Sequence, residues 1–242
     1  MKRINILTLF PNQFEGFLGN SIVKRAIAKG AVSFNIINIR DFSLDKNHRV
    51  DDRPTGGGAG LIMRMEPLMD CLRKSDLMAT HKILMSPRGK TFQQSDAIRL
   101  AEADADITLI CGHYEGVDAR FDDQVDELLS IGDFILTGGE LAAQCIADAI
   151  TRLLPGAIAE ESTQEESFSS GLLEYPQYTF PKEYEGHSIP EILFCGDHEK
   201  VRQFRIREAI KITRQKRPDL LTTRVWTREE LEALAEIEKE EK

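Results

Sequence analysis

The stretch FILTGGELAAQCIADAITRLLPG (134–156) contains a short apolar run, two glycines and then a helical pattern that closes on a Pro-Gly pair. This order predicts a strand over 134–137, a glycine turn and a helix over 141–156. Turns between a strand and a helix often hold nucleotides. Asp133 and Glu140 flank this turn, which has no lysine or arginine, so it is poorly suited to hold a phosphate.

The same alternation of strand and helix patterns continues toward the N-terminus. Expected strands cover 4–10, 34–42, 82–87 and 107–112, and expected helices cover 17–32, 65–75, 91–103 and 122–130. Strands separated by helices pair in parallel, with the helices on the faces of the sheet. The predicted fold class is therefore α/β with a parallel sheet.

Composition limits the class of protein. The chain has 242 residues, of which 41% are hydrophobic, enough for one large domain and a smaller one. Its net charge of −9 argues against a surface that binds nucleic acid everywhere, but not against a local basic patch. Without an apolar run long enough to span a bilayer, the chain is expected to be cytoplasmic, with no membrane partner.

The four cysteines are far apart and have no metal-ligand spacing, so zinc is not expected. Cys71, Cys111 and Cys145 lie in apolar periodic segments and are expected to be buried packing residues. Unpaired thiols of this kind fit a reducing compartment.

Three glycine-containing loops each follow an expected strand: SPRG (86–89), CGHYEG (111–116) and IGDFILTGGE (131–140). In parallel sheets, ligands bind beyond the carboxyl ends of the strands, so these loops predict one pocket. Neither dinucleotide nor P-loop spacing is present. Four carboxylates near the turns would repel a pyrophosphate: Glu115, Asp118, Asp133 and Glu140. S-adenosylmethionine, which has a sulfonium cation and no phosphate, fits this constraint, whereas NAD and ATP do not.

Basic residues are concentrated near the C-terminus. Between Lys200 and Arg224 there are nine lysines and arginines against two acidic residues. On a helix, four of them would form one stripe: Lys200, Arg207, Lys211 and Arg214. Such a stripe is either a solvated face or a surface for a nucleic-acid backbone, and its segregation in an acidic chain favours the nucleic acid.

DDRPTGGGAG (51–60) is expected to be a loop, either without a role or ordered by a bulky polyanion. The acidic segment 157–171 resembles an exposed linker, in which a carboxylate could act as a general base once substrate orders it.

A series of sequence blocks in fixed order resembles the bacterial tRNA (guanine-N1)-methyltransferases of the TrmD type, in the SPOUT superfamily. The blocks are LTLFP (7–11), RDF (40–42), VDDRPTGGGAG (50–60), MSPRG (85–89), CGHYEGVDAR (111–120), SIGDFILTGGELA (130–142), SFSSGLLEYPQYTFP (167–181) and CGDHEKVRQFR (195–205). They cover nearly the whole chain.

The resemblance implies a SPOUT domain with a trefoil knot over 1–160, a flexible linker over 161–176 and a small helical tRNA-binding domain over 177–242. It also implies a homodimer with active sites across the subunit interface. The implied reaction transfers a methyl group from S-adenosylmethionine to N1 of guanosine 37, just 3′ of the anticodon, in the anticodon stem-loop of tRNA. A role for Mg²⁺ is implied as well, although no compact group of carboxylates suggests its site.

Residue roles follow from the same resemblance. The catalytic pair would be Glu166, the base, and Arg152, which stabilises negative charge on the guanine. The expected cofactor-binding residues are Met85, Ser86, Pro87, Gly112, Glu115, Ile131, Gly132, Asp133, Phe134, Ile135, Leu136, Gly138 and Gly139. The expected substrate-binding residues are Arg53, Ser169, His198, Arg202 and Arg205.

Two positions depart from the family pattern. Glu166 stands where the family has an aspartate, with Glu165 as the alternative base, and His113 stands where many relatives have arginine. These departures leave two other functions open: a noncatalytic RNA-binding protein whose active site has drifted, and a ribose 2′-O-methyltransferase of the same superfamily.

Overall fold

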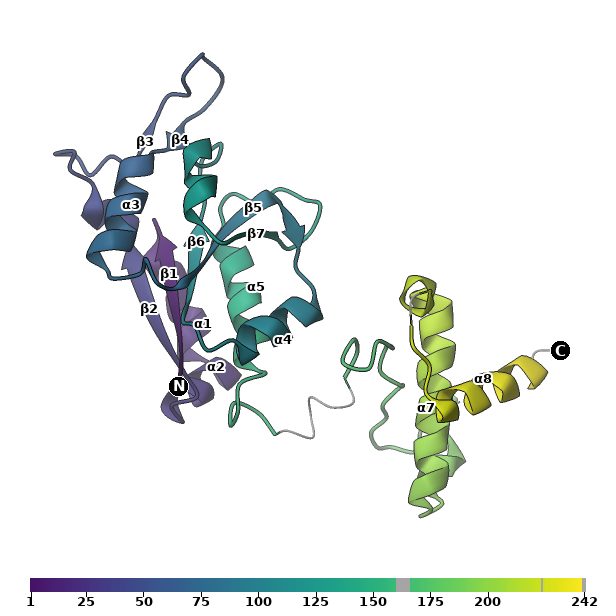
Figure 1. The fold of residues 1–242 in the computed structure, drawn as a ribbon. Coiled ribbons are helices and arrows are strands. Elements are labelled where there is room, and N and C mark those ends of the chain that lie inside the picture. Colours follow the sequence, from purple (N-terminus) through teal and green to yellow (C-terminus); the bar gives the residue numbers. More distant parts are fainter. Residues whose placement is uncertain (160–165, 223, 241–242) are drawn as a thin grey trace. The chain divides into compact units, whose positions relative to one another are not determined.

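The computed structural model describes residues 1–159, 166–222 and 224–240. The chain divides into two compact units, Met1–Glu160 and Glu161–Lys242, which are described separately below (Figure 1). Of the expected linker over 161–176, residues 161–165 lie outside the described residues.

Unit 1 is built on a five-stranded sheet in the order β2-β1-β6-β5-β7. The strands are β1 (Lys2–Thr8), β2 (Val32–Asn38), β5 (His81–Thr91), β6 (Ile107–Cys111) and β7 (Glu127–Ser130). All four neighbouring pairs are parallel. Every residue of the central strand β6 is buried, as expected for a strand covered on both faces. The predicted α/β class with a parallel sheet is confirmed.

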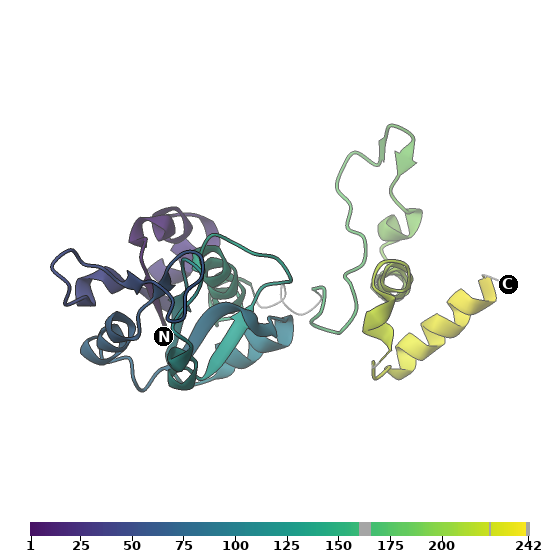
Figure 2. The ribbon, with the colours of Figure 1, turned by 90° about the horizontal axis from the view of Figure 1, so that it is seen from above.

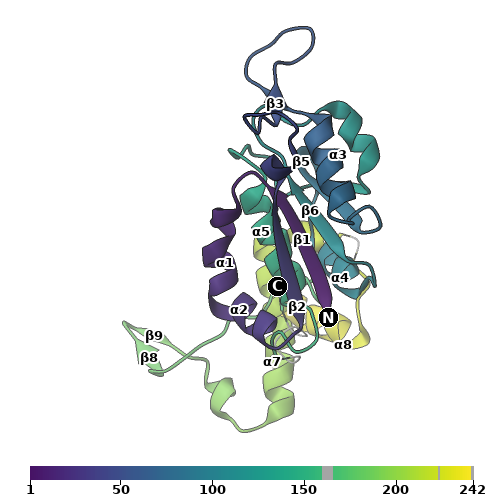
Figure 3. The same cartoon turned by 90° about the vertical axis from the view of Figure 1, so that its left-hand side faces the viewer.

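Helices cover both faces of this sheet (Figure 3). The helices of unit 1 are α1 (Glu15–Gly19), α2 (Ser21–Ala28), α3 (Met65–Lys74), α4 (Gln94–Glu102) and α5 (Glu140–Thr151), with short 3-10 turns η1 (Pro11–Phe14), η2 (Ile39–Phe42) and η3 (Ala119–Gln124). One core cluster joins α2, α4 and α5 to the sheet through residues such as Ala26, Leu100 and Ile146. A second cluster packs α3 on the opposite face, through Leu68 and Leu72.

Two of the sequence predictions for unit 1 are wrong. Residues 122–130 were expected to form a helix, but they contain the end of η3 and then β7, because Leu128 pairs with Leu84 at the edge of the sheet. Residues 134–137 were expected to form a strand, but they lie in an irregular loop. Phe134 and Ile135 are 53% and 80% exposed, so the apolar run is not the buried strand that its composition suggested.

Two smaller differences concern the start of the chain and the thiols. The helix expected over 17–32 is broken at Asn20 and ends at Ala28, and its last expected residue, Val32, begins β2. Cys71 and Cys111 are buried as expected, and burial raises the pKa of the Cys71 thiol to about 12. The expectation for Cys145 is wrong, because this residue lies on the exposed face of α5.

The glycine-rich segment lies between two very short strands, β3 (Asp51–Asp52) and β4 (Ile62–Met63), which pair antiparallel. Arg53 is exposed at the start of this loop.

Unit 2 contains the hairpin β8 (Glu183–Tyr184) and β9 (His187–Ser188), the turns η4 (Glu191–Phe194) and η5 (Pro218–Leu221), and two helices, α7 (His198–Lys216) and α8 (Arg228–Glu240). Figure 2 views α7 nearly along its axis, with α8 beside it. Their common core includes Leu172, Ile210 and Ile237.

The basic stripe predicted on α7 is partly neutralised within unit 2. Arg207 donates to Glu236 at 3.2 Å and to Glu240 at 2.6 Å, both on α8. Lys211 pairs with Glu208 at 3.3 Å and lies 3.9 Å from Glu240. Two members of the stripe are therefore paired within unit 2, and contact of the stripe with a nucleic acid stays a prediction.

The close approach of β5 to β7 at Gly89 gives a test of the fold. A Cβ at Gly89 would lie 2.4 Å from the carbonyl carbon of Leu128 and 2.5 Å from the amide nitrogen of Leu129. We expect Gly89→Ala to lower the free energy of unfolding of unit 1 by about 1–3 kcal/mol, because neither backbone can move aside without breaking the sheet.

Urea unfolding followed by circular dichroism would measure this loss, while the fluorescence of Trp226, the single tryptophan, follows unit 2. Gly16→Ala is the control, since nothing lies within 4 Å of a Cβ at that position in α1. Equal midpoints for the two variants would contradict the packing described at Gly89.

Candidate functional site

A pocket of about 610 Å³ opens beside β5 and at the carboxyl ends of β6 and β7. Its walls come from three segments, which contain the three glycine stretches that the sequence predicted to converge. The expectation that 86–89 is a loop is wrong, because these residues belong to β5, which continues to Thr91 through a shift in its register with β7. The lining residues are Leu84, Met85, Ser86, Pro87, Arg88, Gly112, His113, Tyr114, Glu115, Gly116, Val117, Ala119, Leu129, Ser130, Ile131, Gly132, Phe134, Ile135, Leu136, Thr137, Gly138, Gly139 and Ala142. The volume is within the usual range for small-molecule sites.

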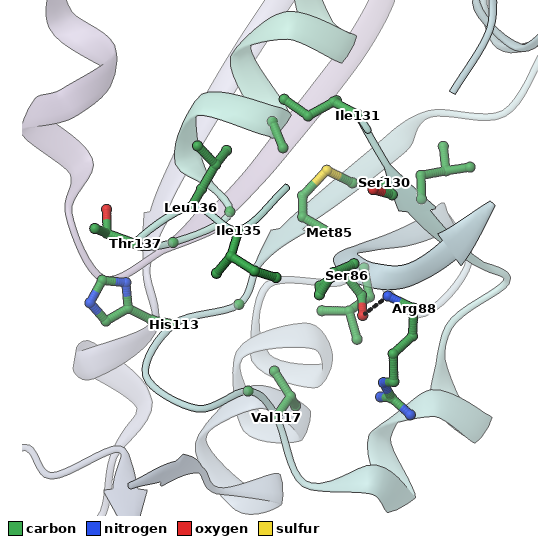
Figure 4. A pocket seen from close by; sticks show the side chains of 18 of the residues that line it. Met85, Ser86, Arg88, His113, Val117, Ser130, Ile131, Ile135, Leu136 and Thr137 are labelled. Carbon is green, nitrogen blue, oxygen red and sulfur yellow. Dashed lines mark hydrogen bonds between the residues drawn. The ribbon is translucent and has the colours of Figure 1, made fainter. Parts of the chain in front are cut away.

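The pocket gathers all of the predicted cofactor-binding residues except Asp133, which is not part of the lining. Figure 4 shows Met85 and Ser86, which belong to β5, with Ile135 and Leu136 from the loop that follows β7. The hydroxyl of Ser86 accepts a hydrogen bond from the backbone N–H of Arg88 at 3.2 Å. The walls are therefore mostly apolar side chains and glycine backbone, with few charged groups.

Glycine allows the loop after β7 to reach the ends of the central strands. The N–H of Gly139 donates to the carbonyl of Gly112 at 2.8 Å, and Gly138 forms an antiparallel bridge with His113. A Cβ on Gly139 would lie 2.8 Å from Cα of Cys111 and 2.9 Å from Cβ of Met85. This contact places α5 directly behind the floor of the pocket.

Glu140, the first residue of α5, is 3% exposed and does not line the pocket. Its carboxylate accepts a hydrogen bond from the hydroxyl of Thr8 at 2.8 Å. The same hydroxyl accepts the backbone N–H of Phe10 at 2.9 Å. A carboxylate in the first turn of a helix is also favoured by the helix dipole. Glu140 is therefore a buried structural group.

The pocket has fewer carboxylates in its lining than the sequence predicted. Of the four carboxylates invoked, Glu115 alone belongs to the described lining. Asp118 lies outside it and binds Arg120 at 2.6 Å, and the hydrogen bonds from that side chain lower the pKa of the aspartate. The basic member of the lining, Arg88, is paired with Asp122 at 3.0 Å.

His113 lies at the edge of the pocket, between two aromatic rings. Its ring centroid is 4.9 Å from that of Phe10 and 5.0 Å from that of Tyr114. Its backbone N–H donates to the sulfur of Met63 at 3.2 Å, and its ring Nδ1 is buried without a hydrogen-bond partner. Figure 4 shows the imidazole next to Thr137.

Several lining residues were not predicted as ligand contacts. They are Leu84, Arg88, His113, Tyr114, Gly116, Val117, Ala119, Leu129, Ser130, Thr137 and Ala142. Most of them are immediate neighbours in sequence of residues that were predicted. Their position in the same three glycine-containing segments could therefore have identified them from the sequence. Leu129 and Ser130 were missed because β7 was expected to be a helix.

The predicted catalytic pair does not line the pocket. Arg152 is the C-cap residue of α5, at the end of a helix of 12 residues whose first residue adjoins the pocket. A helix of that length is about 18 Å long. Glu166 belongs to unit 2, where its carbonyl accepts the N–H of Ser169 at 3.2 Å. Glu165 lies outside the described residues.

Three predicted substrate contacts of unit 2 share one face of α7, because His198, Arg202 and Arg205 are spaced by four and three residues. The fourth, Ser169, lies outside this helix. Arg202 donates to Glu229 at 2.6 Å and to Glu199 at 2.8 Å, and these bonds raise the pKa of its guanidinium. Arg205 lies over the ring of Tyr175, 4.7 Å from its centroid.

Within the described residues, no three histidine, cysteine or acidic side chains form a group that could hold a metal ion. None of the described helices is both long and apolar enough to span a membrane.

Comparison with known proteins gives consistent matches over almost the whole sequence. A family model described as tRNA (Guanine-1)-methyltransferase TrmD matches residues 1–223. A protein of Dictyoglomus turgidum named tRNA (guanine-N(1)-)-methyltransferase is 47% identical over 241 residues, covering 99% of this chain and 98% of the relative. Proteins with the same name from Halalkalibacterium halodurans and Fusobacterium nucleatum are 47% and 48% identical, and each match covers 99% of both sequences.

The buried bond between Thr8 and Glu140 gives a test of how the pocket floor is held. We expect Thr8→Val to lower the free energy of unfolding by about 1–3 kcal/mol, because it leaves a buried carboxylate without its donor. Thr151→Val is the matched control: the Thr151 hydroxyl is buried without a hydrogen-bond partner, so its removal should not destabilise the protein. Urea unfolding of both variants measures the difference, and equal losses would refute the role given to Thr8.

Proposed function

This chain belongs to the tRNA (guanine-1)-methyltransferase family, and we propose that it uses S-adenosylmethionine to methylate N1 of guanosine 37, just 3′ of the anticodon. One observation carries the proposal beyond family membership: a single pocket gathers the glycine loops expected to hold the methyl donor. The donor, when bound, supplies a methyl group on a cationic sulfur.

The pocket has suitable groups for this donor. Backbone N–H and C=O groups of Gly112 and of the loop 131–139 would contact adenine and ribose, and the apolar walls would cover them. Glu115, the carboxylate of the described lining, would lie near the cationic end. Of the four carboxylates expected near the turns, Glu115 alone lines the pocket, so the apolar walls and the glycine backbone are the main support for this donor.

The chemistry requires a base and a group that stabilises negative charge. N1 of guanine carries a proton at neutral pH and must lose it before the nitrogen can attack the methyl carbon. Glu166 would accept this proton, and Arg152 would stabilise the charge that develops toward O6. Glutamate is one methylene longer than the aspartate of the family pattern, so the backbone beside Glu166 would have to adjust to give the same reach.

A homodimer would explain why Arg152 is far from the pocket of its own chain. The two ends of α5 are separated by more than an arginine side chain can span. Phe134, Ile135 and Leu141 are 53%, 80% and 54% exposed near the pocket, which is unusual for large apolar side chains in a monomer. A second copy would cover them and could supply Arg152 to complete the site.

The trefoil knot remains part of the proposal. It is supported by the tight crossing of the loop after β7 against β5 and the end of β6, where Gly139 leaves no room for a side chain.

The anticodon stem-loop would contact unit 2 and the glycine-rich loop of unit 1. Arg53, Ser169, His198, Arg202 and Arg205 are the proposed contacts, since they combine guanidinium groups with hydrogen-bond donors that suit phosphates. Arg202 would exchange its bonds to Glu199 and Glu229 for contacts with RNA. Mg²⁺, which the resemblance implies, has no ligand group among the described residues, so no step is assigned to it.

Methyl transfer to unmodified tRNA tests the proposal. We expect Glu166→Ala to lower kcat by roughly 100- to 10,000-fold, because a general base is lost, while the dissociation constant for S-adenosylmethionine stays nearly unchanged. Mass spectrometry of nucleosides from treated tRNA should find N1-methylguanosine. Methyl on ribose would support the 2′-O-methyltransferase alternative. Binding of tRNA without binding of S-adenosylmethionine would support the noncatalytic one.

Two of the four arginines of α7 provide a test of RNA contact. We expect Arg205→Ala to weaken tRNA binding. In a plot of the logarithm of affinity against the logarithm of salt concentration, the slope should become less steep by about one unit, as for the loss of one phosphate contact. Arg207→Ala is the comparison, because Arg207 is already bound to Glu236 and Glu240 on α8. Its effect should appear in the stability of unit 2. If Arg207→Ala lost more tRNA affinity than Arg205→Ala, then Arg207 and not Arg205 would be the RNA contact.

A further inference from the structure

We propose that Gly60 is a positioning residue for Glu115: its missing side chain leaves the space in which the Glu115 carboxylate lies, at the edge of the pocket. This inference rests on the proposed function, since it assumes that Glu115 contributes to binding of S-adenosylmethionine. The residues that carry it belong to two segments about fifty residues apart in the sequence, the end of the glycine-rich loop and the loop after β6.

The first observation is a contact that only glycine permits. Gly60 has a φ of +74°, and a Cβ built on it would lie 2.4 Å from Cγ, 2.6 Å from Oε1 and 2.9 Å from Cδ of Glu115. The whole outer part of the glutamate side chain therefore covers the bare Cα of Gly60. Since Cγ is close to the backbone of residue 115, a small movement of the carboxylate would not relieve the overlap.

The second observation is that the two segments are held together by their backbones. The N–H of Glu115 donates to the carbonyl of Leu61 at 2.9 Å, and the N–H of Met63 donates to the carbonyl of Gly116 at 2.9 Å. The N–H of Asp118 donates to the carbonyl of Met63 at 3.0 Å, and Met63 forms a parallel bridge with Val117. Residues 60 and 115 therefore cannot separate unless this short ladder breaks.

One side-chain movement would relieve the overlap between a methyl group at residue 60 and Glu115. Glu115 is exposed, so its side chain can rotate about χ1 into solvent at little cost to the fold. This rotation would carry the carboxylate away from the position that it occupies at the pocket. Beyond the strain of an alanine at positive φ, which lowers stability, the effect of the overlap itself should therefore appear in donor binding.

The neighbouring glycines do not share this contact. A Cβ at Gly56 or Gly57 would meet nothing within 4 Å, and one at Gly58 would meet only Cγ of Pro54, at 3.4 Å. The glycine-rich segment therefore has two parts. Residues 56–58 supply backbone conformations with positive φ, whereas Gly60 supplies space for a functional side chain.

The experiment is a double-mutant cycle on the full chain, with the dissociation constant for S-adenosylmethionine measured by calorimetry. We expect Gly60→Ala and Glu115→Ala each to weaken binding by roughly tenfold, and the double variant to bind no more weakly than Glu115→Ala alone, as for residues that act through one contact. Gly30→Ala is the matched control: its φ of +71° imposes the same backbone strain, and a Cβ there meets nothing within 4 Å.

Three outcomes would overturn the inference while leaving the proposed function intact. They are unchanged donor affinity in Gly60→Ala, an equal loss in Gly30→Ala, and additive losses in the double variant. Failure of the wild-type protein to bind the donor would instead contradict the proposed function.

Thermal unfolding tests whether each variant still folds. Gly60→Ala and Gly30→Ala should show similar decreases in Tm. If Gly60→Ala does not fold, the double variant with Glu115→Ala should recover folding, because the overlapping atoms are gone. A double variant that also fails to fold would refute the contact as the cause.

Discussion

The pocket depends on the approach of one backbone to two others. The loop after β7 must return to β5 and to the end of β6 before α5 begins, and at Gly139 the three backbone segments are so close that a single methyl group would overlap with Cys111 and Met85. The hydrogen bond from Gly139 to Gly112 fixes this crossing at 2.8 Å. Because the loop is fixed at this point, its residues 131–138 can line a cavity although they form no strand or helix.

Much of unit 1 could be predicted from the sequence because its strands are continuous apolar runs, and burial on both faces produces that pattern directly. The same logic failed at 134–137, where Phe134 and Ile135 are apolar but exposed. An apolar run indicates that its side chains are buried against something. It does not show whether they pack in a strand of the sheet, against a ligand or against a second copy of the protein. The opposite error occurred at Leu128 and Leu129, which were expected in a helix and lie in the strand β7. Strand and helix patterns cannot be distinguished over four residues.

The charges were harder to predict than the fold, since formal charge in a sequence says nothing about internal pairing. Asp118 and Glu140 were expected at the ligand, yet each has a partner within the protein, Arg120 and Thr8 respectively. Arg207 was expected to face RNA, but its partners are glutamates about thirty residues later, on a helix whose docking no local pattern reveals. For Glu140 and Arg207 a partner distant in sequence decides where the charge points, whereas Asp118 is paired with Arg120 only two residues later.

The resemblance to a family supplied roles that physical reasoning alone could not, and the structure adds a constraint on how those roles can be combined. The pocket lies at the first turn of α5, the proposed arginine at its last turn, and the proposed base in the other compact unit. The pocket of a single chain therefore has a place for the methyl donor, but its described lining includes neither proposed catalytic group, although Arg152 belongs to unit 1. If these assignments hold, donor binding requires only one folded unit 1, whereas methyl transfer also requires unit 2 and an arginine from beyond that pocket. Binding and catalysis should then be separable, with the donor pocket formed before the complete active site.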